Sequence, residues 1–309
     1  MNIVRQFTPD GFELRTLDKP NSEALIKAVG DVDYILAGGR LKISQQVLEK
    51  APKLKMIQRS GVGLDSLDLD AIRKKRIPVY INQGINADSV AEHTLLLMLA
   101  CLRNLPKINT NTHNGIWSKQ EQGVETFELS NKITGLVGMG NIGQRVAKLV
   151  NTFGSKVIYY SEPRLTLEDE SNLGIEYVSL EKLLQQADIV SLHCPLTEQT
   201  RNMIGTAELA KMKKGSIIIN TARGGLIDED ALYNQLVSGQ IRNAALDVYS
   251  QEPITKENKL CKLDNIILTP HIGGVTYESF SSMMYEAMRN IQFFENGKLD
   301  EISDRLLTL

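Results

Sequence analysis

The sequence of 309 residues carries a formal net charge of −2, and its length allows two domains of ordinary size. This small net charge gives no electrostatic reason to expect nucleic-acid or anionic-membrane binding. Hydrophobic residues make up 42% and charged residues 23%, as is ordinary for a globular protein. The scattered Cys101, Cys194 and Cys261 form no C-x-x-C pair, so we predict neither a metal site nor a disulfide framework. The N-terminus shows no basic segment followed by an apolar one, so we expect no signal peptide, and the longest apolar run, residues 95–102, is too short to span a bilayer. We therefore expect a cytoplasmic protein with no membrane partner.

The first hundred residues alternate between strand-like and helix-like segments, which predicts a parallel sheet covered on both faces. The expected strands are residues 2–4, 33–37, 56–59 and 78–81. The expected helices are residues 21–29, 44–50 and 69–75. The turn Gly61-Val62-Gly63 follows the third strand, at the edge where open α/β sheets bind ligands. Its N–H groups are therefore candidates to hold a carboxylate, and a plain strand-to-helix turn is the alternative.

A long helix is expected from Asp88, with Asp88 as its N-cap, and it leads into a second α/β unit. His93 lies in this helix and faces either the core or a cleft. Residues 104–125 are polar and contain the only tryptophan, Trp117. We expect this segment to lie outside the sheets, with Trp117 packed locally or against a partner subunit and His113 facing solvent.

The stretch 132–162 is typical of a strand, a glycine turn, a helix and a second strand. Gly138 permits the tight turn, Gly140 lets the backbone approach a pyrophosphate, and Gly143 lets helix and strand pack closely. The N-terminus of the helix offers free N–H groups and a positive dipole end to the phosphates. The pattern predicts a dinucleotide site formed by Gly138, Gly140, Asn141, Ile142 and Gly143.

The alternation resumes after the glycine turn. Strands are expected at 156–160, 189–193, 216–220, 243–248 and 265–268. Helices are expected at 180–186, 208–212, 230–236 and 277–296. The last helix is long enough to return and pack on the first unit. The predicted fold is α/β, with two doubly wound parallel-sheet domains and a cleft between them.

Three strand ends in the second half deliver polar side chains to one rim of the sheet. Arg223 follows the first, Asp247 and Glu252 follow the second, and His271 follows the third. The arginine is suited to clamp a carboxylate and polarise the adjacent keto oxygen. The histidine is suited to pass the proton that accompanies a hydride, with Glu252 orienting it. Singly, each residue also has an ordinary role, as a surface ion pair, a loop carboxylate or a strand-end cap.

Across nearly its full length the chain resembles the D-isomer-specific 2-hydroxyacid dehydrogenase family. The resemblance is carried by residues 138–143, 220–224, 247–249 with Glu252-Pro253, and 269–274. It implies a Rossmann nucleotide domain and a flavodoxin-like substrate domain. It also implies D-isomer-specific hydride transfer between a nicotinamide cofactor and a small 2-oxo or 2-hydroxy acid.

The resemblance implies roles for individual residues. Arg223 would bind substrate, Glu252 would be the acidic partner, and His271 the acid/base. The amides of Gly61, Val62 and Gly63 would hold the substrate carboxylate. The edge of the adenine site would be formed by His193, Cys194 and Pro195. Asp247 would contact the nicotinamide carboxamide. The other implied cofactor contacts are Thr221, Ala222 and Gly273.

The resemblance also implies how the chain is divided and assembled. Residues 1–98 and 281–309 would form the substrate domain, and residues 99–280 the nucleotide domain. A homodimer would form through the nucleotide domain, with residues 104–125 in its interface.

The cofactor position departs from the family pattern. The strand after the glycine turn would normally end in an Asp that binds the ribose 2′-OH, but here the chain has Ser161 and then Glu162. Ser161 and Arg164 are suited to accept a 2′-phosphate, whereas Glu162 is suited to replace the Asp and repel that phosphate. We predict NAD, with NADP as the alternative.

The substrate position departs as well. Members acting on 3-phosphoglycerate place an arginine-rich turn after the strand at 33–37, but this chain has Gly38 first, followed later by Arg40 and Lys42. The sequence ends at residue 309, so we expect no regulatory domain of the kind that some of those members carry. We expect small unphosphorylated acids such as glyoxylate, hydroxypyruvate or pyruvate. The alternatives are D-3-phosphoglycerate dehydrogenase of serine synthesis and, in another class, an NAD(H)-sensing, corepressor-like binding protein.

Overall fold

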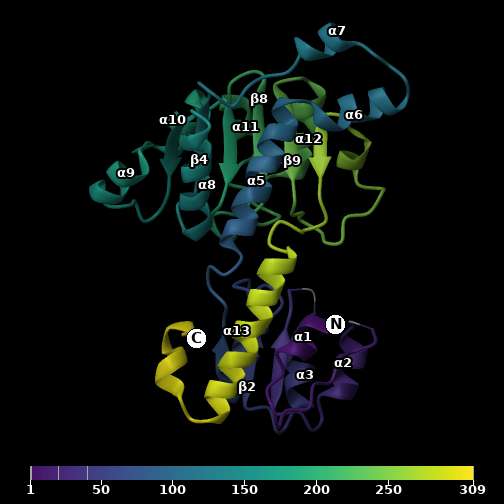
Figure 1. Cartoon of the computed structure of the whole chain (residues 1–309), viewed down its shortest axis with the longest axis vertical. Helices are drawn as coiled ribbons and strands as arrows, with labels where there is room; N and C mark the ends of the chain where they lie inside the picture. The colour runs from purple at the N-terminus through teal and green to yellow at the C-terminus, as the bar shows by residue number, and fades with distance from the viewer. Residues whose placement is uncertain (1, 20, 40, 309) are drawn as a thin grey trace. The chain divides into compact units, whose positions relative to one another are not determined.

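The computed structural model describes residues 2–19, 21–39 and 41–308. The chain forms two compact units, Met1–Asn86 with Val275–Leu309, and Ala87–Gly274 (Figure 1). The sequence favours boundaries at 98/99 and 280/281, whereas these units divide at 86/87 and 274/275. No helix in the described ranges is both long and apolar enough to cross a membrane.

The first unit contains both chain ends and a parallel sheet in the order β1-β2-β3. Its strands are β1 (Tyr34–Ala37), β2 (Met56–Arg59) and β3 (Val79–Tyr80). Its helices are α1 (Asn2–Gln6), α2 (Ser22–Ala28), α3 (Gln45–Glu49), α4 (Leu69–Lys75), α13 (Tyr277–Glu295) and the 3-10 helix η2 (Leu299–Arg305). In Figure 1, α13 runs in yellow beside the purple N-terminal elements of this unit, so the closing helix packs where the sequence predicts.

The strand predicted at residues 2–4 is wrong, because this segment forms α1. Val4 and Phe7 lie one helical turn apart and pack into the cluster around Met288 and Ile291 of α13. Three apolar residues are too few to distinguish a strand from a helix, and packing on α13 decides between them.

Both faces of the first sheet are buried, as expected for a doubly wound unit. Successive residues of a strand point to opposite faces. Ile57 joins the cluster formed with α2, α3 and α4, whereas Met56 joins the cluster formed with α13 and η2. The expected strands and helices of this unit are otherwise confirmed, with β2 and α4 at the predicted residues.

The second unit is built on a seven-stranded parallel sheet in the order β10-β9-β8-β7-β4-β5-β6. Its strands are β4 (Ile133–Val137), β5 (Lys156–Tyr160), β6 (Ile175–Tyr177), β7 (Ile189–Leu192), β8 (Ser216–Asn220), β9 (Ile241–Leu246) and β10 (Ile266–Leu268). Its helices are α5 (Ala87–Leu102), α6 (Leu105–His113), α7 (Lys119–Gly123), α8 (Asn141–Thr152), α9 (Leu167–Leu173), α10 (Leu180–Gln186), α11 (Thr206–Lys211), α12 (Glu229–Val237) and the 3-10 helix η1 (Lys259–Lys262). Neither α9 nor β6 is among the elements predicted from the sequence.

The strand order of this sheet reverses at β4, which pairs with β5 on one side and with β7 on the other. In open α/β sheets the ligand crevice lies outside the carboxyl ends of the strands at such a reversal. Helices cover both faces, because Ile218 of β8 belongs to one apolar cluster and Ile217 and Ile219 to the other. The fold therefore places the glycine turn after β4 at the expected ligand site.

The helix α5 begins at Ala87, so Asp88 lies inside its first turn, and the prediction of Asp88 as N-cap is wrong. The segment 104–125 contains the short helices α6 and α7, joins no strand and extends from the sheet (Figure 1). Trp117 is 83% exposed within it, and His113 is exposed as predicted.

Candidate active site

The turn between β4 and α8 is shaped by close backbone contacts. Gly138 has φ +99°, and a Cβ added there would lie 2.6 Å from the carbonyl carbon of His193. A Cβ on Gly143 would lie 2.3 Å from the Gly138 oxygen. A Cβ on Gly140 would meet no described heavy atom within 4 Å. Two glycines are thus required by the fold, and the third leaves open the backbone at the N-terminus of α8, which fits a pyrophosphate.

The end of β5 is joined to this turn. The Gly138 N–H donates to the Tyr160 oxygen at 2.8 Å, and the Met139 N–H donates to Ser161 Oγ at 3.2 Å. The Glu162 carboxylate accepts a hydrogen bond from the Tyr160 hydroxyl. Ser161 and Glu162 therefore lie beside the glycine turn, where a cofactor ribose would be expected.

The end of β7 forms an uncharged rim beside the same turn. Nε2 of His193 lies 2.9 Å from Ser191 Oγ, and its buried Nδ1 has no hydrogen-bond partner among the described residues. Burial lowers the pKa of His193 to about 3 and raises the pKa of the Cys194 thiol to about 11. Both side chains are therefore neutral near pH 7, which suits contact with an uncharged adenine ring.

The loop after β8 is held by the side chain of Asn220. Its Nδ2 donates to the Arg223 oxygen at 2.9 Å, and its Oδ1 accepts from the Ala222 N–H at 3.0 Å. Thr221 Oγ1 lies 2.8 Å from Thr94 Oγ1 on α5. These bonds fix the backbone from which the Arg223 guanidinium extends.

His271 and Glu252 meet directly. Nδ1 of His271 lies 2.7 Å from Oε2 of Glu252, and Oε1 of Glu252 accepts the Tyr249 N–H at 3.1 Å. The two side chains are 49% and 36% exposed. Because Glu252 engages Nδ1, the opposite ring nitrogen, Nε2, is the one placed to exchange a proton with a ligand.

Asp247 organises the turn that carries His271. The Asp247 carboxylate accepts hydrogen bonds from the Thr269 hydroxyl at 2.6 Å, the Ile272 N–H at 2.9 Å and the Gly273 N–H at 2.8 Å. Burial opposes its charge, but these bonds and that of His93 outweigh burial and lower the pKa of Asp247. His271 itself has φ +55°, a conformation that side chains rarely adopt. This turn is therefore held in place by its surroundings.

His93 belongs to this cluster, a placement that the sequence left open. Its Nε2 lies 3.1 Å from Thr269 Oγ1 and 3.6 Å from Asp247 Oδ1. Thr269 and Tyr249 lie in stretches that carry the family resemblance, but the sequence predicts no role for them. The Tyr249 hydroxyl donates to the oxygens of Leu246 and Thr269. These contacts join residues that are far apart in the chain, so no local sequence pattern predicts them.

In the first unit, Arg59 holds the backbone of the Gly61–Gly63 turn. This arginine is buried, and its guanidinium donates to the Gly63 oxygen at 2.5 Å, the Gly38 oxygen at 2.5 Å and Ser66 Oγ at 3.1 Å. The bonds join the turns after β1 and β2. Lys42 is exposed, and Arg40 lies outside the described residues.

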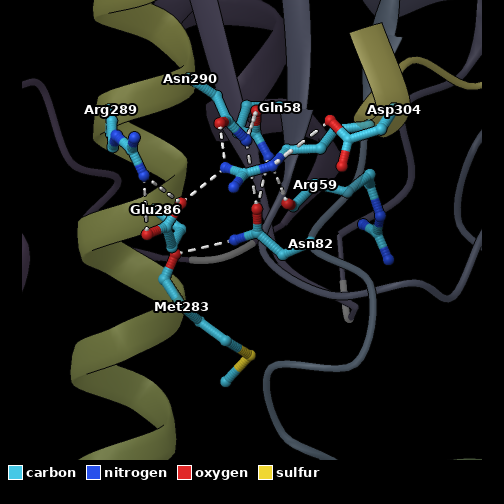
Figure 2. Close-up of polar contacts among 9 residues, drawn as sticks. Gln58, Arg59, Asn82, Met283, Glu286, Arg289, Asn290 and Asp304 are labelled. Carbon is cyan, nitrogen blue, oxygen red and sulfur yellow. Dashed lines mark hydrogen bonds and ion pairs between the residues drawn. The ribbon is translucent and has the colours of Figure 1, made fainter. Parts of the chain in front are cut away.

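A buried polar cluster lies next to Arg59 (Figure 2). Gln58 Nε2 donates to the Arg59 oxygen at 2.8 Å, and Gln58 Oε1 accepts from Asn290 Nδ2 of α13 at 3.2 Å. Asn82 donates to the Met283 oxygen at 2.8 Å. The turn is thus connected through hydrogen bonds to the closing helix.

Comparison with known proteins agrees with this geometry. The family model described as D-isomer specific 2-hydroxyacid dehydrogenase, NAD binding domain, matches residues 95–273. Hydroxypyruvate reductase of Thermotoga maritima is 41% identical over 89% of this chain and 89% of its own length. D-3-phosphoglycerate dehydrogenase of Methanocaldococcus jannaschii is 43% identical over 90% of this chain, which spans 53% of that protein. The structure of D-lactate dehydrogenase from Aquifex aeolicus, complexed with NAD and lactic acid, matches with TM-score 0.85 and 32% identity, covering 93% of this chain and 90% of that one.

The fold and the site define a nicotinamide-dependent oxidoreductase that acts on small 2-hydroxy and 2-oxo acids, with NAD as cofactor. The chain belongs to the D-isomer-specific 2-hydroxyacid dehydrogenase family. These relatives are enzymes, and they give no support to the corepressor-like alternative.

Proposed function

We propose that the chain reduces small unphosphorylated 2-oxo acids to D-2-hydroxy acids, with glyoxylate and hydroxypyruvate ahead of 3-phosphohydroxypyruvate. The 2.7 Å contact between His271 and Glu252 carries the reaction type, because it orients one ring nitrogen for proton transfer. Gly38 supports the substrate class, because it brings no cationic side chain to the first position after β1. Relatives named hydroxypyruvate reductase and glyoxylate reductase agree with this choice.

The proposed roles follow from charge and hydrogen-bonding capacity. The N–H groups of Gly61–Gly63 receive the substrate carboxylate, and Arg223 binds the carboxylate and the keto oxygen. NADH, when bound, supplies the hydride to the keto carbon. Nε2 of His271 donates its proton to the keto oxygen, which becomes the hydroxyl, and Glu252 holds Nδ1 of the charged ring. In the oxidative direction the same nitrogen takes the proton back.

The nucleotide would be held by residues of the second unit. The pyrophosphate would lie against Gly140, Asn141, Ile142 and the N-terminus of α8, and the ribose against Ser161 and Glu162. The remaining cofactor contacts are proposed for His193, Cys194, Pro195, Thr221, Ala222, Asp247 and Gly273.

A substrate panel tests the proposal. Glyoxylate, hydroxypyruvate, pyruvate and 3-phosphohydroxypyruvate are compared by the loss of NADH absorbance. We expect kcat/KM for glyoxylate or hydroxypyruvate to exceed that for 3-phosphohydroxypyruvate. A clear preference for 3-phosphohydroxypyruvate would instead assign the chain to phosphoglycerate oxidation.

We also propose a homodimer formed through residues 104–125. The exposed Trp117, Ile116 and Val124 support it, because large apolar side chains gathered on one segment favour association. Sedimentation analysis should give a dimer for the natural chain and a smaller species for Trp117→Asp. A monomeric natural chain would contradict the proposal. A cytoplasmic location stays a prediction from the sequence.

A further inference from the structure

The guanidinium of Arg164 pairs with one carboxylate along one of its edges. Its Nε lies 2.6 Å from Oε1 of Glu170, and its Nη2 lies 2.8 Å from Oε2 of the same residue. The guanidinium also stacks 4.7 Å from the ring centre of Tyr177. Arg164 follows Ser161 and Glu162 at the end of β5, so it is the cation nearest in sequence to the proposed ribose site.

Burial and a second hydrogen bond fix the position of the Glu170 carboxylate. This residue lies on α9, its side chain is 9% exposed, and the Tyr159 hydroxyl donates to its Oε1 at 2.6 Å. Hydrogen bonds from Arg164 and then from Tyr159 lower the pKa of Glu170 to about 2. The carboxylate is therefore charged near pH 7, and it accepts hydrogen bonds from Nε and Nη2 of Arg164.

The contact matters for the choice between NAD and NADP. The two cofactors differ by a 2′-phosphate, an anion that proteins bind with bidentate arginine. Arg164 already donates two hydrogen bonds to Glu170, whose negative charge lies against the guanidinium. The carboxylate of Glu162, which accepts from the Tyr160 hydroxyl, adds a negative charge beside the ribose position.

We propose that Glu170 is a positioning residue that withholds Arg164 from a 2′-phosphate and so favours NAD over NADP. The inference rests on the proposed ribose site at Ser161 and Glu162. It concerns a residue on α9 that touches neither the glycine turn nor the His271 cluster in any contact described above. Removing the carboxylate releases an arginine that Tyr177 still supports from one side.

The variant Glu170→Gln isolates the charge. Its amide oxygen can still accept the hydrogen bond from the Tyr159 hydroxyl, so the link between α9 and β5 is retained. Glu176→Gln is the matched control, because Glu176 lies on β6 and pairs with Lys156 at 2.8 Å. Both variants remove one negative charge from the same edge of the sheet, but only the first one changes the partner of Arg164.

The measurement is the dissociation constant of NAD⁺ and of NADP⁺ for each variant, by titration calorimetry. Glu170→Gln should shift the ratio of the two constants toward NADP⁺ by about tenfold, the effect of roughly one charge-assisted hydrogen bond. The gain should shrink as salt concentration rises and should vanish in the double variant Glu170→Gln/Arg164→Ala. Because the ratio is taken within one preparation, a partly unfolded sample does not alter it.

A ratio for Glu170→Gln within twofold of the natural value would overturn the inference. So would an equal gain in Glu176→Gln, or a gain that survives removal of Arg164. Binding of nucleotide without turnover of any 2-oxo acid would contradict the proposed substrate instead, because the calorimetric ratio needs no substrate.

Discussion

At the residue scale, one carboxylate fixes the geometry of the proposed acid/base. One carboxylate oxygen of Glu252 accepts the Tyr249 N–H, and the other contacts Nδ1 of His271. The side chains of Glu252 and His271 therefore cannot rotate independently. The cluster of Asp247, Thr269 and His93 holds the backbone on which the ring stands. Proton transfer depends on this preorganisation as much as on the histidine itself.

His271→Ala should lower kcat by about 10²- to 10⁴-fold, the usual contribution of a general acid/base. Calorimetry should find NADH affinity retained, because none of the proposed nucleotide contacts is removed. His113→Ala on the exposed helix α6 is the control and should keep full activity. Unchanged turnover in His271→Ala would refute the assigned role.

His193 should make stability sensitive to acid. Burial lowers its pKa in the folded chain, so below a pH of about 6.5 the unfolded chain takes a proton that the folded one refuses. The free energy of unfolding should therefore decrease as the pH is lowered. This group contributes at most about 1.4 kcal/mol of that decrease per pH unit. Denaturant titrations between pH 7 and 5 should show a shallower fall for His193→Gln. An identical pH dependence in both proteins would contradict this origin.

At the element scale, the glycines of the turn after β4 have different roles. Gly143 is needed for packing, and Gly140 leaves the space proposed for the cofactor. The Cβ of Gly143→Ala would press on the Gly138 oxygen, whereas that of Gly140→Ala meets no described atom within 4 Å. Gly143→Ala should lose about 1 to 3 kcal/mol of stability together with NAD affinity. Gly140→Ala should keep its melting temperature and lose NAD affinity alone, because its methyl group enters the space proposed for the pyrophosphate. Gly30→Ala, in the turn after α2 of the first unit, is a control for both measurements because its Cβ meets no described atom within 4 Å. Equal NAD affinity in Gly140→Ala and the natural chain would contradict the prediction.

The sequence predicted best the elements whose pattern is local and strong. The strands β5 and β8 match the expected ranges, because short runs rich in β-branched or aromatic residues and bounded by turns leave little choice. It missed β6, whose three residues form a strand only through pairing with β5, and it misread α1. The motifs predict the site residues, which stay a prediction, but they leave the facing of His93 open and give no role to Arg59 or Glu170, whose contacts depend on the folded chain.

At the scale of the whole molecule, the first unit is made of two distant chain segments joined by buried polar contacts. Asn290 of α13 donates to Gln58 and Asn82 and accepts from Arg305 (Figure 2). Because each partner is shielded from water, the loss of one side chain leaves several groups unsatisfied.

Asn290→Ala should therefore destabilise the first unit by about 3 kcal/mol. Hydrogen exchange should speed up in β2 and β3 and stay slow in β4 and β8 of the second unit. The exposed neighbour Gln292→Ala is the control and should change neither. Faster exchange in both units to the same extent would show that they unfold together, against the division seen in the structure.

The most direct test of the central claim is the reaction of hydroxypyruvate with NADH, followed by chiral analysis of the glycerate formed. We expect one D-glycerate for each NADH consumed, and NADH loss about 10²- to 10⁴-fold slower in His271→Ala. L-glycerate as the product, or NADH that stays reduced with every small 2-oxo acid, would contradict the account.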